Sequence, residues 1–236
     1  MASMTNSTDK IAIVTGASRG LGLAIVRALV DRGWTLIIDA RNGENLVAAK
    51  EGLGDKTIAI PGDVSVADHR TRLIDAARDA GGLDLLINNA SVLGPSPQPT
   101  LDSYPLDVLR HVQEVNFMAP LALIQSSLPL LRERHGIVVN ITSDAAVEAY
   151  PGWGGYGSSK AALNQMTNIL GAEEPDVAVY SFDPGDMNTQ MHQEAFPGED
   201  ISDRPPPERS VPPLIALLEG RPPSGAYRAS DVLLAS

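Results

Sequence analysis

The sequence predicts one doubly wound α/β domain with a mostly parallel sheet of about seven strands. Short apolar runs rich in β-branched residues alternate with segments of helical periodicity, which indicates repeated β-α-β units. The strand runs are almost continuously apolar, as expected when helices cover both faces of a sheet. The chain has 236 residues, a length that suits a single domain with a large core.

The strands and helices follow one another in the order that such units require. Strands are expected over residues 10–15, 35–39, 57–61, 83–88, 136–142 and 176–182. Helices are expected over about 21–31, 44–51, 66–80, 104–132 and 155–171. The third helix begins after Ser65, which is the residue best suited to cap it.

The last fifth of the chain has a different composition. Residues 183–223 are crowded with Pro, Gly and charged side chains. Short helices are expected there at about 188–195 and 208–219, followed by a strand at 224–229. Because α/β domains bind ligands at the carboxyl ends of strands, residues 186–223 are predicted to form a substrate lid. Residues 1–9 are expected to be a disordered leader, and residues 10–236 the single domain.

Composition and charge disfavour several classes of function. Asp and Glu number 29 against 18 Lys and Arg, and the net charge of −11 argues against a nucleic-acid partner. There is no cysteine, which excludes a disulfide scaffold, a thiolate metal site and a cysteine nucleophile. No apolar stretch reaches the ~20 residues of a membrane span, and no secretory signal is recognisable, so a cytoplasmic protein is expected. No cluster of His, Asp and Glu has metal-ligand spacing, and no metal is expected.

A glycine-rich loop follows the first strand, with the sequence Thr15-Gly16-Ala17-Ser18-Arg19-Gly20-Leu21-Gly22. Glycines allow a tight turn and a close approach of the backbone to a pyrophosphate, and the following helix offers free N–H groups. The alternative is an ordinary turn between a strand and a helix. The position of the loop between those two elements favours nucleotide binding.

Tyr156 and Lys160 are four residues apart on one predicted helix and therefore share a face. A free tyrosine has a pKa near ~10, which is too high for acid–base work at neutral pH. A neighbouring ammonium group lowers such a pKa towards the working pH. The alternative is a half-buried tyrosine with a solvated lysine one turn away.

An ordered set of motifs runs through residues 10–190. The glycine loop has the form TGxxxGxG, Asn88-Asn89-Ala90-Ser91 ends the fourth strand, and Asn116 lies on the long helix. Ser143 ends the fifth strand, Tyr156 and Lys160 form YxxxK, and Pro184-Gly185 precedes Thr189. Together these motifs resemble the classical branch of the short-chain dehydrogenase/reductase family, whose fold is a Rossmann domain. The chain departs from the family at Ser91, where glycine is common, and in the lid, which matches no family pattern.

The resemblance implies four catalytic residues. Tyr156 would exchange a proton with the carbonyl or alcohol oxygen, and Ser143 would hydrogen-bond that oxygen. Lys160 would lower the pKa of Tyr156 and hold the nicotinamide ribose. Asn116 would support a water that links Lys160 to solvent.

The resemblance also implies how a dinucleotide is bound. Asp63 would accept a hydrogen bond from the adenine amino group, and the Val64 amide would bind the ring. Asn88 and Ala90 would line the ribose, whereas Asn89 would tie the central strands. The full set of expected cofactor residues is Gly16, Ser18, Arg19, Gly20, Leu21, Gly22, Arg41, Asp63, Val64, Asn88, Ala90, Tyr156, Lys160, Pro184, Gly185 and Thr189.

The choice between NADP and NAD depends on the end of the second strand. Ala40 stands where the family's NAD-selecting Asp normally falls, and Arg41 matches the arginine of NADP-dependent members. Arg19 is a second basic residue placed to grip a 2′-phosphate. NADP is therefore expected, and NAD remains the alternative because Asp39 could reach the 2′-hydroxyl.

The resulting prediction is an NADPH-linked oxidoreductase that interconverts a small carbonyl compound and a secondary alcohol. A homodimer or homotetramer built through the helices at 104–132 and 155–171 is expected. The alternatives are an NAD-dependent alcohol dehydrogenase and a non-catalytic NADP-binding regulator. Trp153, Met187 and His192 are candidates for the substrate pocket, whereas the other histidines, His69, His111 and His135, are expected at the surface.

Overall fold

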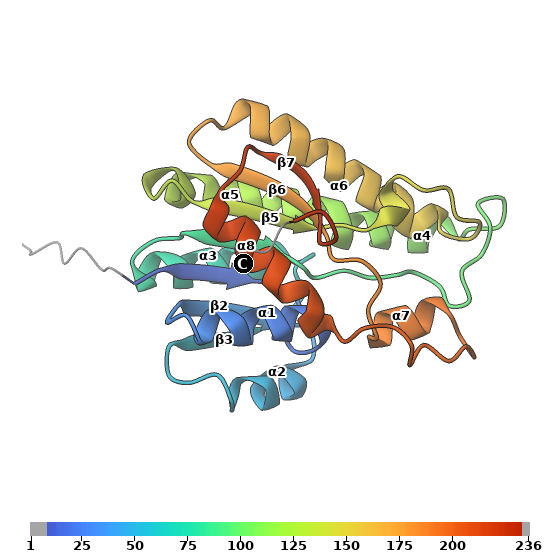
Figure 1. Cartoon of the computed structure of the whole chain (residues 1–236), viewed down its shortest axis with the longest axis horizontal. Coiled ribbons are helices and arrows are strands. Elements are labelled where there is room, and N and C mark those ends of the chain that lie inside the picture. The colour runs from blue at the N-terminus through green and yellow to red at the C-terminus, as the bar shows by residue number, and fades with distance from the viewer. Residues whose placement is uncertain (1–8, 233–236) are drawn as a thin grey trace, which may run out of the picture.

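A computed structural model describes residues 9–232, which form a seven-stranded parallel sheet in the order β3-β2-β1-β4-β5-β6-β7 (Figure 1). The strands are β1 (Ile11–Val14), β2 (Thr35–Ala40), β3 (Thr57–Pro61), β4 (Leu85–Asn88), β5 (Ile137–Ile141), β6 (Ala178–Asp183) and β7 (Gly225–Arg228). The predicted fold class is thus confirmed. The leader expected over residues 1–9 lies, apart from its last residue, outside the described range.

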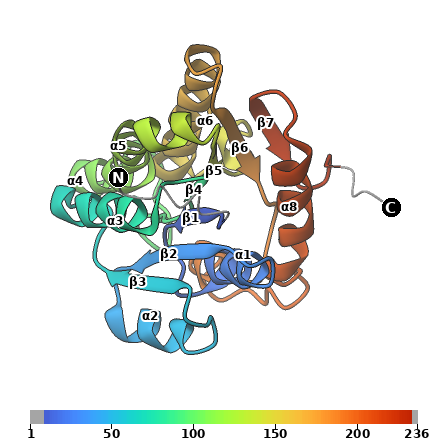
Figure 2. The same ribbon diagram turned by 90° about the vertical axis from the view of Figure 1, so that its left-hand side faces the viewer.

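Helices cover both faces of the sheet (Figure 2). They are α1 (Gly20–Val30), α2 (Gly43–Lys50), α3 (Ala67–Ala80), α4 (Leu106–Gln113), α5 (Ala119–Glu133), α6 (Gly154–Glu173), α7 (Gln190–Ala195) and α8 (Val211–Gly220). Helices α1 and α8 pack on one face, and α3, α5 and α6 pack on the other. No helix in residues 9–232 is both long and apolar enough to cross a membrane.

Each central strand contributes to two separate cores because successive side chains point to opposite faces. In β1, Ala12 and Val14 face α1 and α8, whereas Ile11 and Ile13 face α3 and α5. This two-sided burial is the physical reason for the continuous apolar runs in the sequence.

The strand order changes direction between β1 and β4, which are hydrogen-bonded neighbours at the centre of the sheet. The loops that leave the carboxyl ends of these two strands run to opposite sides. Such a switch point leaves a crevice at the edge of the sheet, where open α/β folds bind their ligands.

The segment expected to be one helix over 104–132 is divided in the structure. A π-helical turn, Glu114–Met118, lies between α4 and α5. Pro120 has no N–H to donate to the carbonyl of Asn116 four residues earlier, and a widened turn accommodates this lost bond. Pro120 is thus the residue in the sequence that indicates this interruption of the helix.

The C-terminal segment contains the expected two helices and final strand. Helix α7 contributes no buried residue, and it lies apart from the two helical layers (Figure 1). The Ser96 hydroxyl donates to the carbonyl of Glu194 at 2.6 Å, which ties α7 to the loop that follows β4.

Candidate active site

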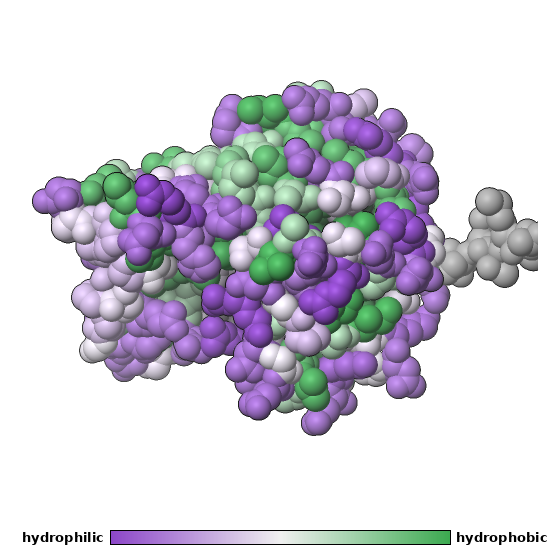
Figure 3. All heavy atoms as spheres, turned by 180° about the vertical axis from the view of Figure 1, so that it is seen from behind, coloured by the Kyte–Doolittle hydropathy of each residue, from purple (hydrophilic) through white to green (hydrophobic). Residues whose placement is uncertain are grey.

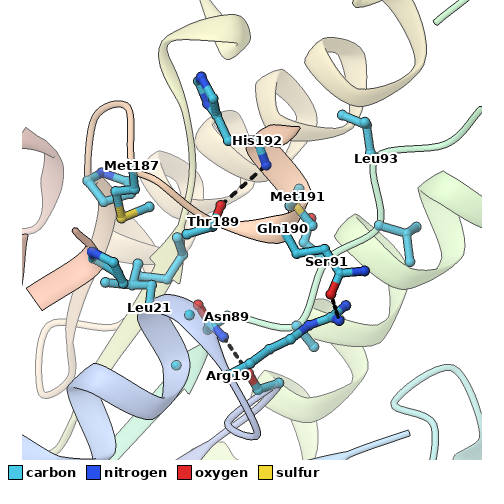
Figure 4. A pocket seen from close by; sticks show the side chains of 18 of the residues that line it. Arg19, Leu21, Asn89, Ser91, Leu93, Met187, Thr189, Gln190, Met191 and His192 are labelled. Carbon is cyan, nitrogen blue, oxygen red and sulfur yellow. Dashed lines mark hydrogen bonds between the residues drawn. The ribbon is translucent and has the colours of Figure 1, made fainter. Parts of the chain in front are cut away.

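A cavity of about 940 Å³ opens at the carboxyl ends of the strands. The segment after β1 contributes Arg19 and Leu21 to its wall, and α7 contributes Gln190, Met191 and His192 (Figure 4). Of the predicted site residues, the structure brings these to the cavity wall: Gly16, Ser18, Arg19, Gly20, Leu21, Gly22, Arg41, Asp63, Val64, Ala90, Ser143, Tyr156, Lys160, Pro184, Gly185 and Thr189. Asn88 and Asn116 are not among the lining residues.

The glycine-rich loop is shaped to receive an anion. Gly16 has a φ of +65°, and a Cβ atom on Gly22 would lie 2.4 Å from the Gly16 carbonyl oxygen. Helix α1 begins after Arg19 with no side-chain cap and no acidic residue in its first turn. Its first N–H groups therefore have no such side-chain acceptor, and they fit the pyrophosphate of a dinucleotide.

Asp39 is buried beneath this loop and is only 1% exposed. One carboxylate oxygen accepts the Gly16 N–H at 2.8 Å, and the other contacts Nε2 of His69 at 2.8 Å. Burial raises the pKa of Asp39 above its usual value, although these hydrogen bonds oppose the change. Both oxygens are thus engaged within the protein.

The surface position expected for His69 is wrong, because the ring is 2% exposed. Nη2 of Arg72 lies 3.1 Å from Nδ1 of His69. A guanidinium group can only donate, so Nδ1 is the acceptor and Nε2 carries the proton that points at Asp39. Asp39, His69 and Arg72 form a chain that ties the glycine-rich loop to α3.

Arg41, which follows β2, and Asp63, which follows β3, line the same part of the cavity. Arg41 is exposed and lies near Asp63, and both line the cavity. Burial alone would raise the pKa of Asp63, but hydrogen bonds from Ser65 hold it below its usual value. Ser65 therefore does not cap α3 as expected. The N-cap residue is Val66, because the Ser65 hydroxyl is directed to Asp63.

Arg19 reaches across the cavity to the lid. Its guanidinium group donates to the side-chain oxygen of Gln190 in α7 (Figure 4). Arg19 therefore connects the glycine-rich loop to α7.

Of the two asparagines at the end of β4, Asn88 has a role different from the one expected, whereas Asn89 has the expected one. Asn88 is buried in the sheet, where its amide donates to the Asn140 side chain of the adjacent strand at 2.8 Å. The expectation that it lines the ribose is therefore not met. Asn89 donates to the carbonyl oxygens of Thr15 and Gly16, as expected for a tie between the central strands, and it also lines the cavity.

Tyr156, Lys160 and Ser143 meet in the middle of the cavity wall. Lys160 donates from Nζ to the Ile141 carbonyl at 2.8 Å, and Nζ lies 5.4 Å from the centre of the Tyr156 ring. Burial lowers the pKa of Lys160 to about 7. Burial also raises the pKa of Tyr156, and the carboxylates of Asp183 and Asp144 add to this effect. The pKa decrease expected from Lys160 is absent: the neighbour that lowers the pKa of Tyr156 is Ser91, through a hydrogen bond, and burial outweighs its effect.

The Asn116 side chain lies behind the cavity wall, and its amide is fully used. Oδ1 accepts from the Val92 N–H at 2.9 Å and from the Ser91 hydroxyl at 3.1 Å. Nδ2 donates to the Val92 carbonyl at 2.9 Å and to the Ser159 hydroxyl at 3.0 Å. With two acceptor and two donor positions occupied, the side chain has no ordinary hydrogen-bonding position left for a water.

Aromatic side chains form the outer part of the pocket. The Trp153 ring lies 5.8 Å from that of Tyr156 and 5.9 Å from that of Phe196. The His192 ring packs on Phe196 at 4.9 Å, and His192 lines the cavity with Met187, as the sequence suggested. Phe196, which directly follows α7, packs against the rings of Trp153 and His192 without lining the cavity itself, and this packing was not foreseen.

Ser143 is held by its neighbour in the chain. Its hydroxyl donates to Oδ1 of Asp144 at 2.9 Å, and the Tyr150 hydroxyl donates to Oδ2 at 2.9 Å.

In residues 9–232, no group of His, Asp and Glu is arranged to hold a metal ion.

Comparisons with known proteins agree with this geometry. A family model described as short chain dehydrogenase matches residues 10–200. An uncharacterized oxidoreductase of Saccharomyces cerevisiae is 34% identical over 185 residues, which cover 77% of this chain and 72% of the yeast protein. Sepiapterin reductase of Mus musculus is 33% identical over 199 residues, covering 78% of this chain and 76% of the mouse protein.

Solved structures have the same fold. A protein from Shigella flexneri, named as a short chain dehydrogenase and complexed with NADP, matches with a TM-score of 0.85 at 27% identity. The match covers 94% of this chain and 97% of that one. With the family model spanning most of the chain and the motif residues gathered around one cavity, the chain belongs to the short chain dehydrogenase family of oxidoreductases.

Proposed function

We propose that this oxidoreductase uses NADPH to reduce a ketone or aldehyde to an alcohol, with Tyr156 as the general acid. The observation that carries the proposal is that one cavity holds both halves of the required machinery. An anion-binding loop and two arginines lie at one end, and Tyr156, Ser143 and Lys160 lie at the other.

The chain's own residues would bind, orient and protonate the substrate. When bound, the nicotinamide supplies the hydride. Ser143 would donate to the carbonyl oxygen once its hydroxyl turns from Asp144, and Tyr156 would give that oxygen its proton. Lys160 would hold the nicotinamide ribose, and Thr189 the carboxamide. The loop of Gly16, Gly20 and Gly22 would hold the pyrophosphate.

The protonation state of Tyr156 is the one that a general acid requires. Burial and two nearby carboxylates raise the pKa of Tyr156, so the phenol persists at neutral pH. The phenol is the form that can donate a proton to a carbonyl oxygen.

The surroundings of Asp39 support NADP over NAD. An acidic side chain selects NAD by binding the ribose 2′-hydroxyl, but both Asp39 oxygens are engaged by Gly16 and His69. Arg41 and Arg19 are left as the charged side chains for a 2′-phosphate. The Shigella flexneri protein of the same fold is complexed with NADP.

Fluorescence titration with NADPH and NADH tests the cofactor. The wild-type protein is expected to bind NADPH at least about tenfold more tightly than NADH, and an Arg41→Ala, Arg19→Ala double variant to lose that preference. Arg110→Ala, a change of an exposed arginine on α4, is the control. Tighter binding of NADH by the wild type would contradict the NADP assignment.

A turnover assay with Tyr156→Phe tests the chemistry. This variant should bind NADPH normally and reduce members of a ketone and aldehyde panel at least about a hundredfold more slowly. Firm cofactor binding by the wild type without turnover of any panel member would instead support a regulator.

The proposal extends to assembly and to the lid. Residues 186–223 would close over the substrate, and α4, α5 and α6 would form a homodimer or homotetramer interface. Leu106, Met118 and Ile169 are large apolar residues exposed on these helices and the π-helical turn, with exposed fractions of 64%, 46% and 49%.

A further inference from the structure

Ser91 is the first residue after the Asn-Asn-Ala run that ends β4, and its role is not explained by the machinery above. It lines the same cavity as the residues that would perform the reaction, and its side chain is labelled in Figure 4. Glycine is common at this position in the family, so the hydroxyl group is a feature of this chain. Any role of this hydroxyl in catalysis rests on the proposed carbonyl reduction.

One side of Ser91 is fixed by Asn116. The Ser91 hydroxyl lies 3.1 Å from Oδ1 of Asn116, and the adjacent Val92 N–H donates to the same oxygen at 2.9 Å. Asn116 is 1% exposed, and its amide is anchored to Val92 and Ser159 by its two donors. A saturated, buried amide is a rigid support, so the Ser91 oxygen has little freedom to move.

The other side of Ser91 faces the catalytic tyrosine: both residues line the cavity, and hydrogen bonding with Ser91 opposes the rise that burial causes in the pKa of Tyr156. Ser159, which receives a hydrogen bond from Asn116, in turn donates to the Tyr156 carbonyl at 2.6 Å. Hydrogen bonds therefore connect Ser91 through Asn116 and Ser159 to the Tyr156 backbone carbonyl.

We propose that Ser91 is a positioning residue that holds the Tyr156 hydroxyl for proton transfer and then stabilises the phenolate that remains. During reduction the O–H bond of Tyr156 breaks and an O–H bond forms on the substrate oxygen. Ser91 keeps its own proton and turns its O–H from Asn116 to the Tyr156 oxygen. Asn116 tolerates this turn because its Oδ1 still accepts from the Val92 N–H.

Ser91→Ala and Ser91→Gly remove the hydroxyl, and the glycine variant carries the residue common in the family. For both, kcat for NADPH-coupled reduction is expected to fall about tenfold, because an uncompensated phenolate forms less readily. The Kd for NADPH should not change, and the solvent deuterium isotope effect on kcat should rise because proton transfer becomes more limiting. Ser91→Thr, which keeps the hydroxyl, should recover much of the rate.

A second measurement does not depend on turnover. The ζ-carbon resonance of Tyr156, assigned with Tyr156→Phe in protein carrying labelled tyrosine, reports the hydrogen bonding of the hydroxyl group. It should shift in Ser91→Ala and stay in place in Ser158→Ala, which removes an exposed hydroxyl from the same helix.

The outcomes separate the two proposals. If the wild type reduces no carbonyl compound, the proposed function fails, whereas the resonance still decides whether Ser91 bonds Tyr156. If the enzyme turns over and Ser91→Ala alters only thermal stability, Ser91 merely supports Asn116 and the positioning role is overturned. An unshifted Tyr156 resonance in Ser91→Ala overturns it as well.

Discussion

Asp39 and His69 join two elements that the sequence keeps thirty residues apart. Both residues are almost completely buried. The His69 ring bonds one Asp39 oxygen, and the Gly16 N–H bonds the other. A buried carboxylate without a partner is costly, so the pair makes the shape of the glycine-rich loop depend on α3.

His69→Ala should therefore destabilise the protein through Asp39. Loss of the ring leaves one buried carboxylate oxygen without its partner, and the free energy of unfolding should fall by about 3 kcal/mol. Burial already raises the pKa of Asp39, and losing His69 raises it further. Protonation of the folded variant then removes part of the penalty, so the difference from the wild type should shrink from neutral pH to about pH 5.

Urea unfolding at several pH values measures this effect. His111→Ala, which truncates an exposed histidine, serves as the control and should change stability little. A stability loss in His69→Ala that does not vary with pH would show that lost packing, rather than the Asp39 charge, is responsible.

The site residues that could be predicted from the sequence are those whose function is indicated by their spacing within one segment. Tyr156 and Lys160 share a helix face, and the structure brings them together with Ser143 at one cavity. The pairing of His69 with Asp39 could not be predicted, because nothing within one segment signals a contact between a strand end and a later helix. Ser91 was visible as a departure from the family, but its partners became apparent only in three dimensions.

At the scale of elements, the glycine-rich loop and α1 work as one unit. Gly22 lies in the first turn of α1, and its missing side chain leaves room for the Gly16 carbonyl and for Nδ2 of Asn89. The loop, the helix and the end of β4 therefore meet at a point where no side chain fits.

Gly22→Ala should damage cofactor binding more than overall folding. The added Cβ would lie 2.4 Å from the Gly16 oxygen and 2.6 Å from Asn89 Nδ2, so the loop has to shift. We expect the affinity for NADPH to fall at least about tenfold and stability to fall by about 1–3 kcal/mol. Gly52→Ala is the matched control, because no atom lies within 4 Å of a Cβ there. Normal NADPH affinity in Gly22→Ala would contradict the placement of the pyrophosphate.

Element types were largely predictable, because strand and helix periodicities differ and the core is two-sided. The expected helix at 66–80 is α3 at Ala67–Ala80, and the expected strand at 35–39 is β2 at Thr35–Ala40. The π-helical turn escaped prediction because its cause, Pro120, also reads as a residue tolerated near the start of a helix.

At the scale of the whole molecule, the face opposite to that of Figure 1 carries a band of apolar side chains. The band crosses the half of the molecule where α4 and α5 lie (Figure 3). Bands of this kind mark interaction surfaces in otherwise polar proteins. In the proposed assembly, a second copy of the chain covers this apolar band.

Ile169→Glu and Met118→Glu should each shift the assembly towards the monomer. A charge in the middle of an apolar interface is desolvated without a partner, which opposes association. Light scattering coupled to size-exclusion chromatography measures the mass, and circular dichroism checks the fold. Val47→Glu, at an exposed apolar residue of α2, is the control. If both variants keep the wild-type mass, this face is not the interface.

The central place of β1 in the sheet has a consequence for the nascent chain. β1 is made first, yet the Thr15 side chain bonds to Ile87, 72 residues later, and Arg19 meets Gln190 only after 171 residues. During synthesis the N-terminal strand can pair with β2, but its other edge stays open until β4 leaves the ribosome. The proposed cofactor would therefore stabilise only the finished domain, and the first half of the chain would fold without it.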